Sequence, residues 1–262
     1  MSRSRALPDI VPVSPTSFDS WLRCPRLHFN EHVLGTPPSD PSPSPDHGLL
    51  VHELLRFVHA HGSCHDDDAV RDALESHGCD DDVYRGVLAR HARRCPSGAV
   101  ESSAHEVDLA RFHRLPPPMF MATARIDAVW VHDGILDARD YKTGRVTHLR
   151  VGDDPRARVQ AHVLAPQAER RGLRLRLRYE HLAADAEDDP EPFEPDADDL
   201  AAIDEELRGA VEAMWRTERW TGVRDEAVCR WCRYRSICPD SAAVGEPVWP
   251  ALLVGGPADD DQ

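Results

Sequence analysis

Hydrophobic side chains recur at a helical spacing in several parts of this chain. Within residues 49–60, Leu50, Leu54 and Val58 fall on one side of a helical projection. This spacing is typical of a helix that buries one face. The helices expected from such segments cover residues 49–60, 67–77, 80–94, 156–171 and 198–220.

A second spacing, in which apolar and polar residues alternate, predicts strands. From Leu173 to Arg178, leucines alternate with arginines, which indicates a half-buried strand. A further strand is expected near residues 105–111, and a β-hairpin over residues 118–141. Because helices and strands are interspersed, we expect an α/β fold, a mixed β-sheet flanked by helices.

The predicted hairpin has a clear turn. The β-prone run 119–131 and the shorter run 135–140 flank the dipeptide Asp133-Gly134. Asp-Gly between two such runs is a signal for a tight turn. The two runs are therefore expected to pair as neighbouring antiparallel strands.

Composition divides the 262-residue chain into three parts. Residues 1–13 are interpreted as a flexible arm, and residues 246–262 as an acidic tail. Between them, residues 14–245 are long enough for one large domain. Inside that domain the proline-rich segment 36–45 is expected to be an extended connector, because proline is poorly accommodated in helices and sheets.

The chain is acidic, with 46 Asp and Glu against 31 Lys and Arg, and a formal net charge of -15. This charge argues against a surface covered with phosphate contacts, although it allows a local basic groove. The chain has no stretch of about 18 apolar residues, and no apolar region follows its first residues. We therefore expect a cytoplasmic protein with no membrane partner.

One lysine stands among 30 arginines, and it lies in Asp140-Tyr141-Lys142-Thr143-Gly144. Lysine differs from arginine in a compact ammonium group whose pKa a buried site can lower. Asp140 and Lys142 point to one face of their strand, and the hairpin can bring Asp127 beside them. Two carboxylates beside an amine suit Mg²⁺ or Mn²⁺ and the attack of water on phosphorus.

Cysteines near the two ends of the chain predict a metal centre. Cys229, Cys232 and Cys238 have the spacing C-x₂-C-x₅-C, and Cys24 can supply a fourth thiol. Four thiolates suit either a [4Fe–4S] cluster or tetrahedral zinc, and their spacing does not separate the two. A centre bound by both ends of the chain would act as a staple.

A second group of potential ligands is less regular. It consists of His59, His61, Cys64 and His65. A scatter of this kind is more often a surface feature than a metal site, so we expect no ion there. Three cysteines are expected in polar loops: Cys64, Cys79 and Cys95.

Six short motifs occur in an order that matches a known family. They are Ser14-Pro15-Thr16-Ser17-Phe18 followed by Cys24-Pro25, Gly48-Leu49-Leu50-Val51-His52, Ile126-Asp127, Asp140-Tyr141-Lys142-Thr143-Gly144, Gln160, and the three C-terminal cysteines. Together they resemble the RecB-like branch of the PD-(D/E)XK nuclease superfamily, in its iron–sulfur form. Relatives in this branch include the nuclease domain of AddB and the nuclease that assists CRISPR spacer acquisition.

The resemblance implies a restriction-endonuclease-like core with a role for each motif. The residues implied as ligands of Mg²⁺ or Mn²⁺ are His52, Asp127, Asp140 and, through its main-chain carbonyl, Tyr141. Lys142 would assist the attacking water, and Gln160 would steady Lys142 or the scissile phosphate. A [4Fe–4S] cluster, rather than zinc, would join Cys24 to the C-terminal cysteines.

Two positions depart from the family pattern. Ala124 occupies a region where the family often has glycine, and Leu164 replaces a tyrosine that would help to place DNA. We expect weaker substrate positioning from these changes, with the chemistry intact. Glu106 is either an extra acid near the metal or a solvent-facing strand residue.

The sequence thus predicts a metal-dependent DNA nuclease, an exonuclease on single-stranded or unwound ends. Its expected setting is DNA repair, recombination or CRISPR-type DNA processing, with a helicase or a CRISPR adaptation protein as partner. The alternative is a non-catalytic module that binds nucleic acid or a partner and keeps the nuclease fold and the cluster. The acidic charge and Leu164 favour this alternative.

Overall fold

The computed structural model describes residues 7–40, 46–61, 63–79, 82–96, 101–114, 118–144, 150–182 and 189–243. The strands are β1 (Ile10–Val13), β2 (Ser102–His113), β3 (Met119–His132), β4 (Ile135–Lys142) and β5 (Arg174–His181). The α-helices are α1 (Pro15–Arg23), α2 (Pro25–His28), α3 (Asp46–His61), α4 (Asp67–Ser76), α5 (Asp82–Ala92), α6 (Pro155–Arg170), α7 (Ala197–Arg216) and α8 (Glu226–Arg230). A π-helical turn covers Phe29–Val33 and a 3₁₀ turn covers Val151–Asp153.

The five strands form one mixed sheet in the order β1-β3-β4-β5, with β2 paired to β3 off this path. The pairs β1–β3 and β4–β5 are parallel, and the pairs β2–β3 and β3–β4 are antiparallel. The parallel connection from β4 to β5 runs through α6, as parallel strands require a crossover. The predicted α/β class, a mixed sheet flanked by helices, is confirmed.

The predicted hairpin is β3 and β4. Asp133 and Gly134 form its turn with φ angles of 51° and 70°, the left-handed conformation that a two-residue hairpin turn needs. The pairing continues from His132 opposite Ile135 to Ala128 opposite Arg139. This tight turn fixes the register of the two strands, and with it the position of every side chain near their far ends.

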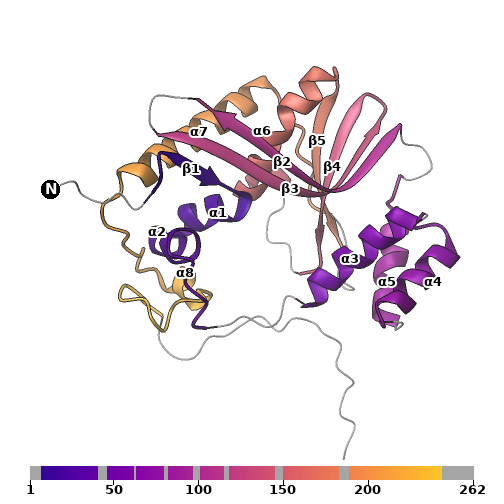
Figure 1. Cartoon of the computed structure of the whole chain (residues 1–262), viewed down its shortest axis with the longest axis horizontal. Coiled ribbons are helices and arrows are strands. Elements are labelled where there is room, and N and C mark those ends of the chain that lie inside the picture. The colour runs from indigo at the N-terminus through magenta and orange to yellow at the C-terminus, as the bar shows by residue number, and fades with distance from the viewer. Residues whose placement is uncertain are drawn as a thin grey trace, which may run out of the picture.

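Helices cover the sheet in two groups that bury separate hydrophobic clusters (Figure 1). Helices α1, α6 and α7 pack with β1 and the first half of β3 in the larger cluster, around Phe18, Phe120 and Leu207. Helices α3, α4 and α5 form a lobe with its own cluster, which includes Leu54 and reaches Trp130 of the sheet. The open end of the β3–β4 hairpin, opposite its turn, lies where the two groups meet.

Strand β3 changes its packing partners at Asp127. Its even-numbered side chains belong to the larger cluster up to Ile126 and to the cluster of the helical lobe from Ala128 onward. Glu106, which lies opposite Asp127 in β2, has a φ of 52°, and a left-handed residue of this kind costs about 1–2 kcal/mol. This left-handed residue interrupts the regular β2–β3 pairing at the position where β3 changes its packing partners.

Most predicted elements are confirmed within two to four residues, and the largest discrepancies lie near the chain's beginning. The predicted arm over residues 1–13 is wrong for its last part, since Ile10–Val13 form β1 with Val11 and Val13 buried. Helix α1 was not predicted, although Ser14 caps it and Pro15 opens it. The tail over residues 246–262 and part of the connector, residues 41–45, lie outside the described residues.

Candidate functional site

The first turns of α3 pass close to the end of β4. A Cβ atom at Gly48 would lie 3.1 Å from the Thr143 hydroxyl oxygen, so glycine allows this close approach. His52 lies one helical turn further along the same face, and its Nε2 is 3.2 Å from the main-chain carbonyl oxygen of Tyr141. The spacing G-x-x-x-H thus places an imidazole at the end of the strand.

Asp127 and Asp140 lie opposite each other at the point where β3 and β4 stop pairing. The register that ends with Ala128 opposite Arg139 places them on the same side of the hairpin. Here Oδ2 of Asp127 accepts a hydrogen bond of 2.7 Å from the main-chain N–H of Tyr141. A side-chain carboxylate therefore replaces the strand carbonyl as hydrogen-bond acceptor, and the strands can part.

Both ring nitrogens of His52 face oxygen atoms. Its Nδ1 lies 3.3 Å from Oδ1 of Asp127 and 4.0 Å from Oε1 of Glu106, while Nε2 faces the Tyr141 carbonyl. Burial favours the neutral ring, but the hydrogen bond to Asp127 and the nearby negative charges raise the pKa of His52 above its ordinary value. The site therefore attracts positive charge at the point where these oxygens converge.

Glu106 joins this group from β2. One ligand atom from each of His52, Glu106 and Asp127 lies within 4.8 Å of the others. Burial and the neighbouring Asp127 carboxylate raise the pKa of Glu106. Sequence reasoning left this residue open, because no motif marks it and its left-handed backbone becomes visible only in the folded sheet.

Asp140 is held by two side chains on its other side. Its Oδ2 forms an ion pair with Lys142, and its Oδ1 accepts a hydrogen bond of 3.2 Å from Nε2 of Gln160 on α6. The Lys142 ammonium lies 4.3 Å from the ring centroid of Tyr179, a cation–π contact. The Tyr179 hydroxyl donates to Oδ2 of Asp154 at 2.7 Å, which fixes the ring beneath the lysine.

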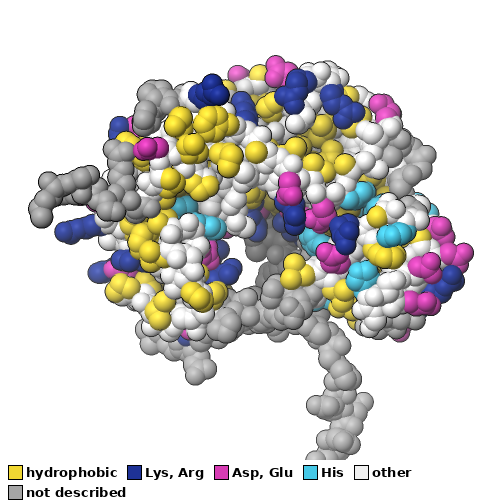
Figure 2. Space-filling model, viewed as in Figure 1, with side chains coloured by type: hydrophobic (Ala, Val, Ile, Leu, Met, Phe, Trp, Pro, Cys, Tyr) yellow, Lys and Arg dark blue, Asp and Glu magenta, His cyan; other side chains and the backbone are white. Residues whose placement is uncertain are grey.

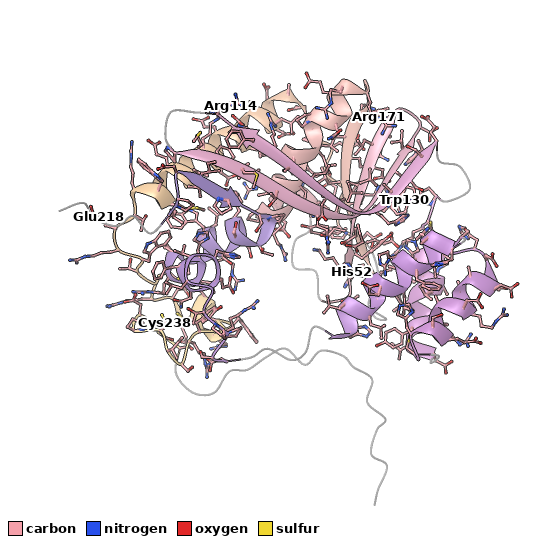
Figure 3. All side chains as sticks on the ribbon, in the orientation of Figure 1. His52, Arg114, Trp130, Arg171, Glu218 and Cys238 are labelled. Atoms are coloured by element: carbon pink, nitrogen blue, oxygen red, sulfur yellow. The ribbon has the colours of Figure 1, made fainter. Side chains whose placement is uncertain are left out.

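The donor set fits a hard divalent cation. His52, Glu106 and Asp127 each offer one ligand atom to this group, and the Tyr141 carbonyl oxygen lies beside His52. Asp140 is not part of the group, because its carboxylate is paired with Lys142 and Gln160. Mg²⁺ and Mn²⁺ prefer such oxygen-rich sites. Two cationic side chains border the site: Lys142 is paired with Asp140, and Nε of Arg125 lies 3.5 Å from Oε2 of Glu106 (Figure 3 labels His52).

The four cysteines expected at a metal centre line one small cavity: Cys24, Cys229, Cys232 and Cys238. None forms a disulfide, and Leu27 and Tyr234 pack beside them. Burial raises the pKa of Cys232, and the other three thiols reinforce this effect. The cavity lies between the start of α2 and the turns after α8, so the two ends of the chain meet there, as the cysteine pattern predicts.

The two departures from the family pattern occupy buried positions. Leu164 is 1% exposed and Ala124 is 5% exposed, and both belong to the larger hydrophobic cluster. Gln160, four residues before Leu164, is also nearly buried. Leu164 thus fills core volume on a helix face where a hydroxyl would need a polar partner.

The mixed sheet presents carboxylates and a lysine where the strands of a hairpin part, an arrangement suited to metal-assisted hydrolysis. The sequence profile of the PD-(D/E)XK nuclease superfamily matches residues 12–239, most of the chain. The chain therefore belongs to the PD-(D/E)XK nuclease superfamily, and its mixed sheet is consistent with the restriction-endonuclease-like core. This membership implies a metal-dependent nuclease that hydrolyses phosphodiester bonds.

Comparison with solved structures finds a similarity to a protein described as SSO0001, from its crystal structure. The two share 13% identity with a TM-score of 0.40, over 88% of this chain and 87% of that chain. No curated protein matches the chain in sequence. Among the described residues, no helix is both long and apolar enough to cross a membrane.

Proposed function

We propose that this protein is a DNA exonuclease of the RecB-like, AddB-like iron–sulfur branch, acting on single-stranded ends. The observation that carries this proposal is the convergence of His52, Asp127 and Asp140 beside the only lysine. The setting we favour is DNA repair, recombination or CRISPR-type DNA processing, with a helicase or a CRISPR adaptation protein as partner.

In this proposal Mg²⁺ or Mn²⁺ is held by His52, Asp127, Asp140 and the carbonyl of Tyr141, and Glu106 is added to the set. The ion would neutralise charge on the scissile phosphate. Lys142, held between Asp140 and the Tyr179 ring, orients the attacking water. Gln160 keeps Asp140 turned toward the site through its hydrogen bond.

The shape of the molecule supports a polynucleotide substrate. Below the sheet, the lobe of α3–α5 and the group that contains α1, α2 and α8 stand on opposite sides (Figure 2). His52 lies on the side of the lobe nearer that group (Figure 3). A net charge of -15 weakens contacts with phosphates. The metal and a limited number of arginines would then provide most of the attraction.

The cysteine cavity supports an iron–sulfur cluster over zinc. Zinc with bonds of about 2.3 Å to four sulfurs requires sulfur atoms about 3.8 Å apart. Among the described residues, the groups whose ligand atoms lie within 4.8 Å of one another contain none of these four cysteines. Thiols that line one cavity at wider spacing suit the larger [4Fe–4S] group.

The first test is degradation of single-stranded DNA by anaerobically purified protein with Mn²⁺, using 5′- and 3′-labelled substrates. Wild type should shorten the DNA from one end, and Lys142→Ala should lose the activity. Thermal unfolding and Mn²⁺ titration of Lys142→Ala show whether the variant keeps its fold and its metal site. Iron content and visible absorption of wild type and Cys238→Ser test the cluster separately.

Three other outcomes have distinct meanings. Intact DNA with both proteins, cluster present and no Mn²⁺ bound, would support the non-catalytic binding module instead. Equal degradation by both proteins would show either a contaminating nuclease or a wrong assignment of Lys142. Zinc in place of iron would overturn the cluster while leaving the nuclease proposal standing.

A further inference from the structure

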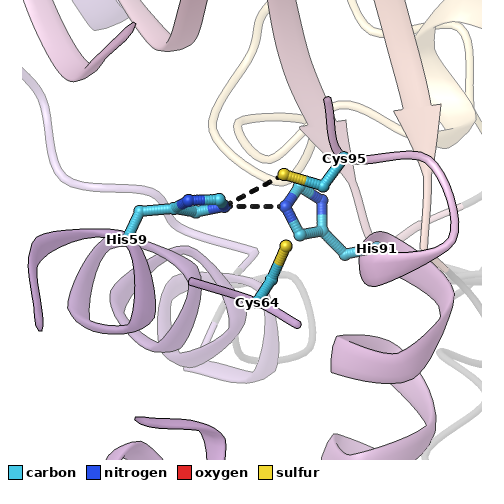
Figure 4. A group of neighbouring side chains, drawn as sticks. All are labelled: His59, Cys64, His91 and Cys95. Atoms are coloured by element: carbon cyan, nitrogen blue, oxygen red, sulfur yellow. Dashed lines mark hydrogen bonds between the residues drawn. The ribbon is translucent and has the colours of Figure 1, made fainter. Parts of the chain in front are cut away.

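A second group of metal-ligating side chains lies inside the helical lobe, away from the four-cysteine cavity. One ligand atom from each of His59, Cys64, His91 and Cys95 lies within 4.8 Å of the other three. Cys64, His91 and Cys95 are buried and His59 is partly buried. Figure 4 shows the two imidazoles and two sulfurs directed at one point.

The group differs from the one expected from the sequence. His61 and His65 do not belong to it: His61 is exposed and bonds to Phe57, and His65 faces the main-chain carbonyl of Cys95. The expectation that Cys64, Cys79 and Cys95 lie in polar surroundings is also wrong, since all three are buried in the core of the lobe. The remaining ligands, His91 in α5 and Cys95 just after it, lie some thirty residues further along the chain.

The geometry is close to that of a tetrahedral site. The Nε2 atoms of His59 and His91 are 2.8 Å apart, and Sγ of Cys95 is 3.8 Å from Nε2 of His59. Zinc with bonds of about 2.0–2.1 Å to nitrogen and about 2.3 Å to sulfur requires separations of about 3.4–3.8 Å between ligands. Small side-chain rotations would open the two imidazoles by the few tenths of an ångström that an ion needs.

His91 is oriented by a partner outside the group. Its Nδ1 lies 2.6 Å from Oε1 of Glu180, whose Oε2 accepts a hydrogen bond of 3.1 Å from Arg139. A carboxylate on the far nitrogen of a ligand histidine fixes the ring and directs the lone pair of Nε2 toward the metal. Glu180 is 1% exposed on β5, so this orienting contact ties helix α5 to the sheet.

We propose that His59, Cys64, His91 and Cys95 bind one structural zinc ion that fastens α3 to α5 within the helical lobe. Each half of the site pairs a histidine in the last turn of a helix with a cysteine just beyond it: His59 with Cys64 after α3, and His91 with Cys95 after α5. Two thiolates and two imidazoles are a ligand set that zinc prefers. All four tetrahedral positions are filled by protein, which is typical of a structural rather than a catalytic zinc.

This zinc would also help to position His52 in the nuclease site. His59 and His52 lie two turns apart on α3, so they point in a similar direction. The ring of Tyr141 packs edge-on against both His91 and His52, at 5.3 and 5.8 Å between centroids. An ion that holds α3 and α5 against this tyrosine therefore also holds His52 against the Tyr141 carbonyl.

The test measures metal content and needs no nuclease activity, so it can fail independently of the proposed function. Wild type should contain one zinc per chain by elemental analysis, and Cys64→Ser and Cys95→Ser should lose it. Cys79→Ser is the matched control, because Cys79 is a buried cysteine of the same lobe outside the group. Cys232→Ser, in the other cysteine cavity, should leave this zinc in place.

Cobalt substitution keeps the test valid if the serine variants fold poorly. Co²⁺ in the site should show tetrahedral visible bands with a charge-transfer band from two thiolates. His59→Cys retains four ligands, so it should keep the metal and increase the thiolate band by about half. Glu180→Gln should weaken zinc affinity by about 10–100-fold.

Two results would overturn the proposal. One is that Cys64→Ser and Cys95→Ser contain as much zinc as the control Cys79→Ser. The other is a Cys64–Cys95 disulfide, with no bound metal, in protein purified without reductant. Either result would leave the four side chains as core packing.

Discussion

The contact between Gly48 and Thr143 allows a sharp test of how α3 positions His52. In Gly48→Ala, the added Cβ would lie 3.1 Å from the Thr143 hydroxyl, so the helix or the threonine must shift by a few tenths of an ångström. The two contacts of His52 measure 3.2 and 3.3 Å, already at the long end of hydrogen bonding. The same shift would therefore break them.

The expected magnitudes follow from two opposing effects. Alanine gains up to about 1 kcal/mol over glycine in a helix, whereas overpacking costs about 1–3 kcal/mol. The free energy of unfolding of Gly48→Ala should therefore change little or fall by about 2 kcal/mol. Loss of the His52 contacts should lower the cleavage rate about tenfold, which corresponds to about 1.4 kcal/mol.

Gly86→Ala on α5 is the matched control, because a Cβ there meets no atom within 4 Å. This variant should gain stability and keep the wild-type cleavage rate. Cleavage of labelled DNA, Mn²⁺ affinity and thermal unfolding would be measured for both variants and for Gly48→Ala combined with Thr143→Ala. If Gly48→Ala cleaves and binds Mn²⁺ as well as Gly86→Ala, the close approach of α3 does not position His52.

Three further predictions concern other contacts. Asparagine tolerates a φ of 52° better than glutamate, so Glu106→Asn should raise the unfolding temperature. The same variant should bind Mn²⁺ more weakly in calorimetry, and unchanged binding would remove Glu106 from the ligand set. Tyr179→Phe removes the hydrogen bond to Asp154 and should lower the free energy of unfolding by about 1 kcal/mol. Because the ring stays under Lys142, the cleavage rate should not change, and a lower rate with unchanged stability would refute this prediction. Burial, assisted by Arg111, lowers the pKa of His162 to about 3. Because the histidine of the unfolded chain binds a proton near pH 6.5, the free energy of unfolding should fall as the pH decreases from about 6.5 to 3. The expected slope is up to about 1.4 kcal/mol per pH unit. Urea unfolding across this range should show a shallower dependence for His162→Gln, and equal slopes would contradict the assignment.

Local patterns in the sequence were sufficient for most of the fold. The hairpin turn at Asp133-Gly134, the leucine alternation in β5 and the helical spacing in α3 each depend on neighbouring residues alone, and each is observed. Strand β1 was missed because four residues carry too weak an alternation. Its pairing with β3, more than a hundred residues away, stabilises it as a strand.

The motif residues of the candidate site were also readable in sequence, since Asp127, Asp140 and Lys142 need only a hairpin to come together. Only the tertiary structure determined which other side chains lie beside them. Glu106 reaches the site from β2, where its own backbone is left-handed. Tyr179 lies under Lys142 because β5 pairs in parallel with β4.

The same distinction separates the two cysteine groups. Cys229, Cys232 and Cys238 lie close in sequence, so their spacing alone predicts a centre, and Cys24 lines the same cavity. The group in the helical lobe takes one histidine from each of two helices and one cysteine from the turn after each helix. Periodicity shows which face of a helix is buried, but it does not show which two helices meet. That choice depends on packing against the sheet, through contacts such as that of His91 with Glu180, and only the folded chain brings them together.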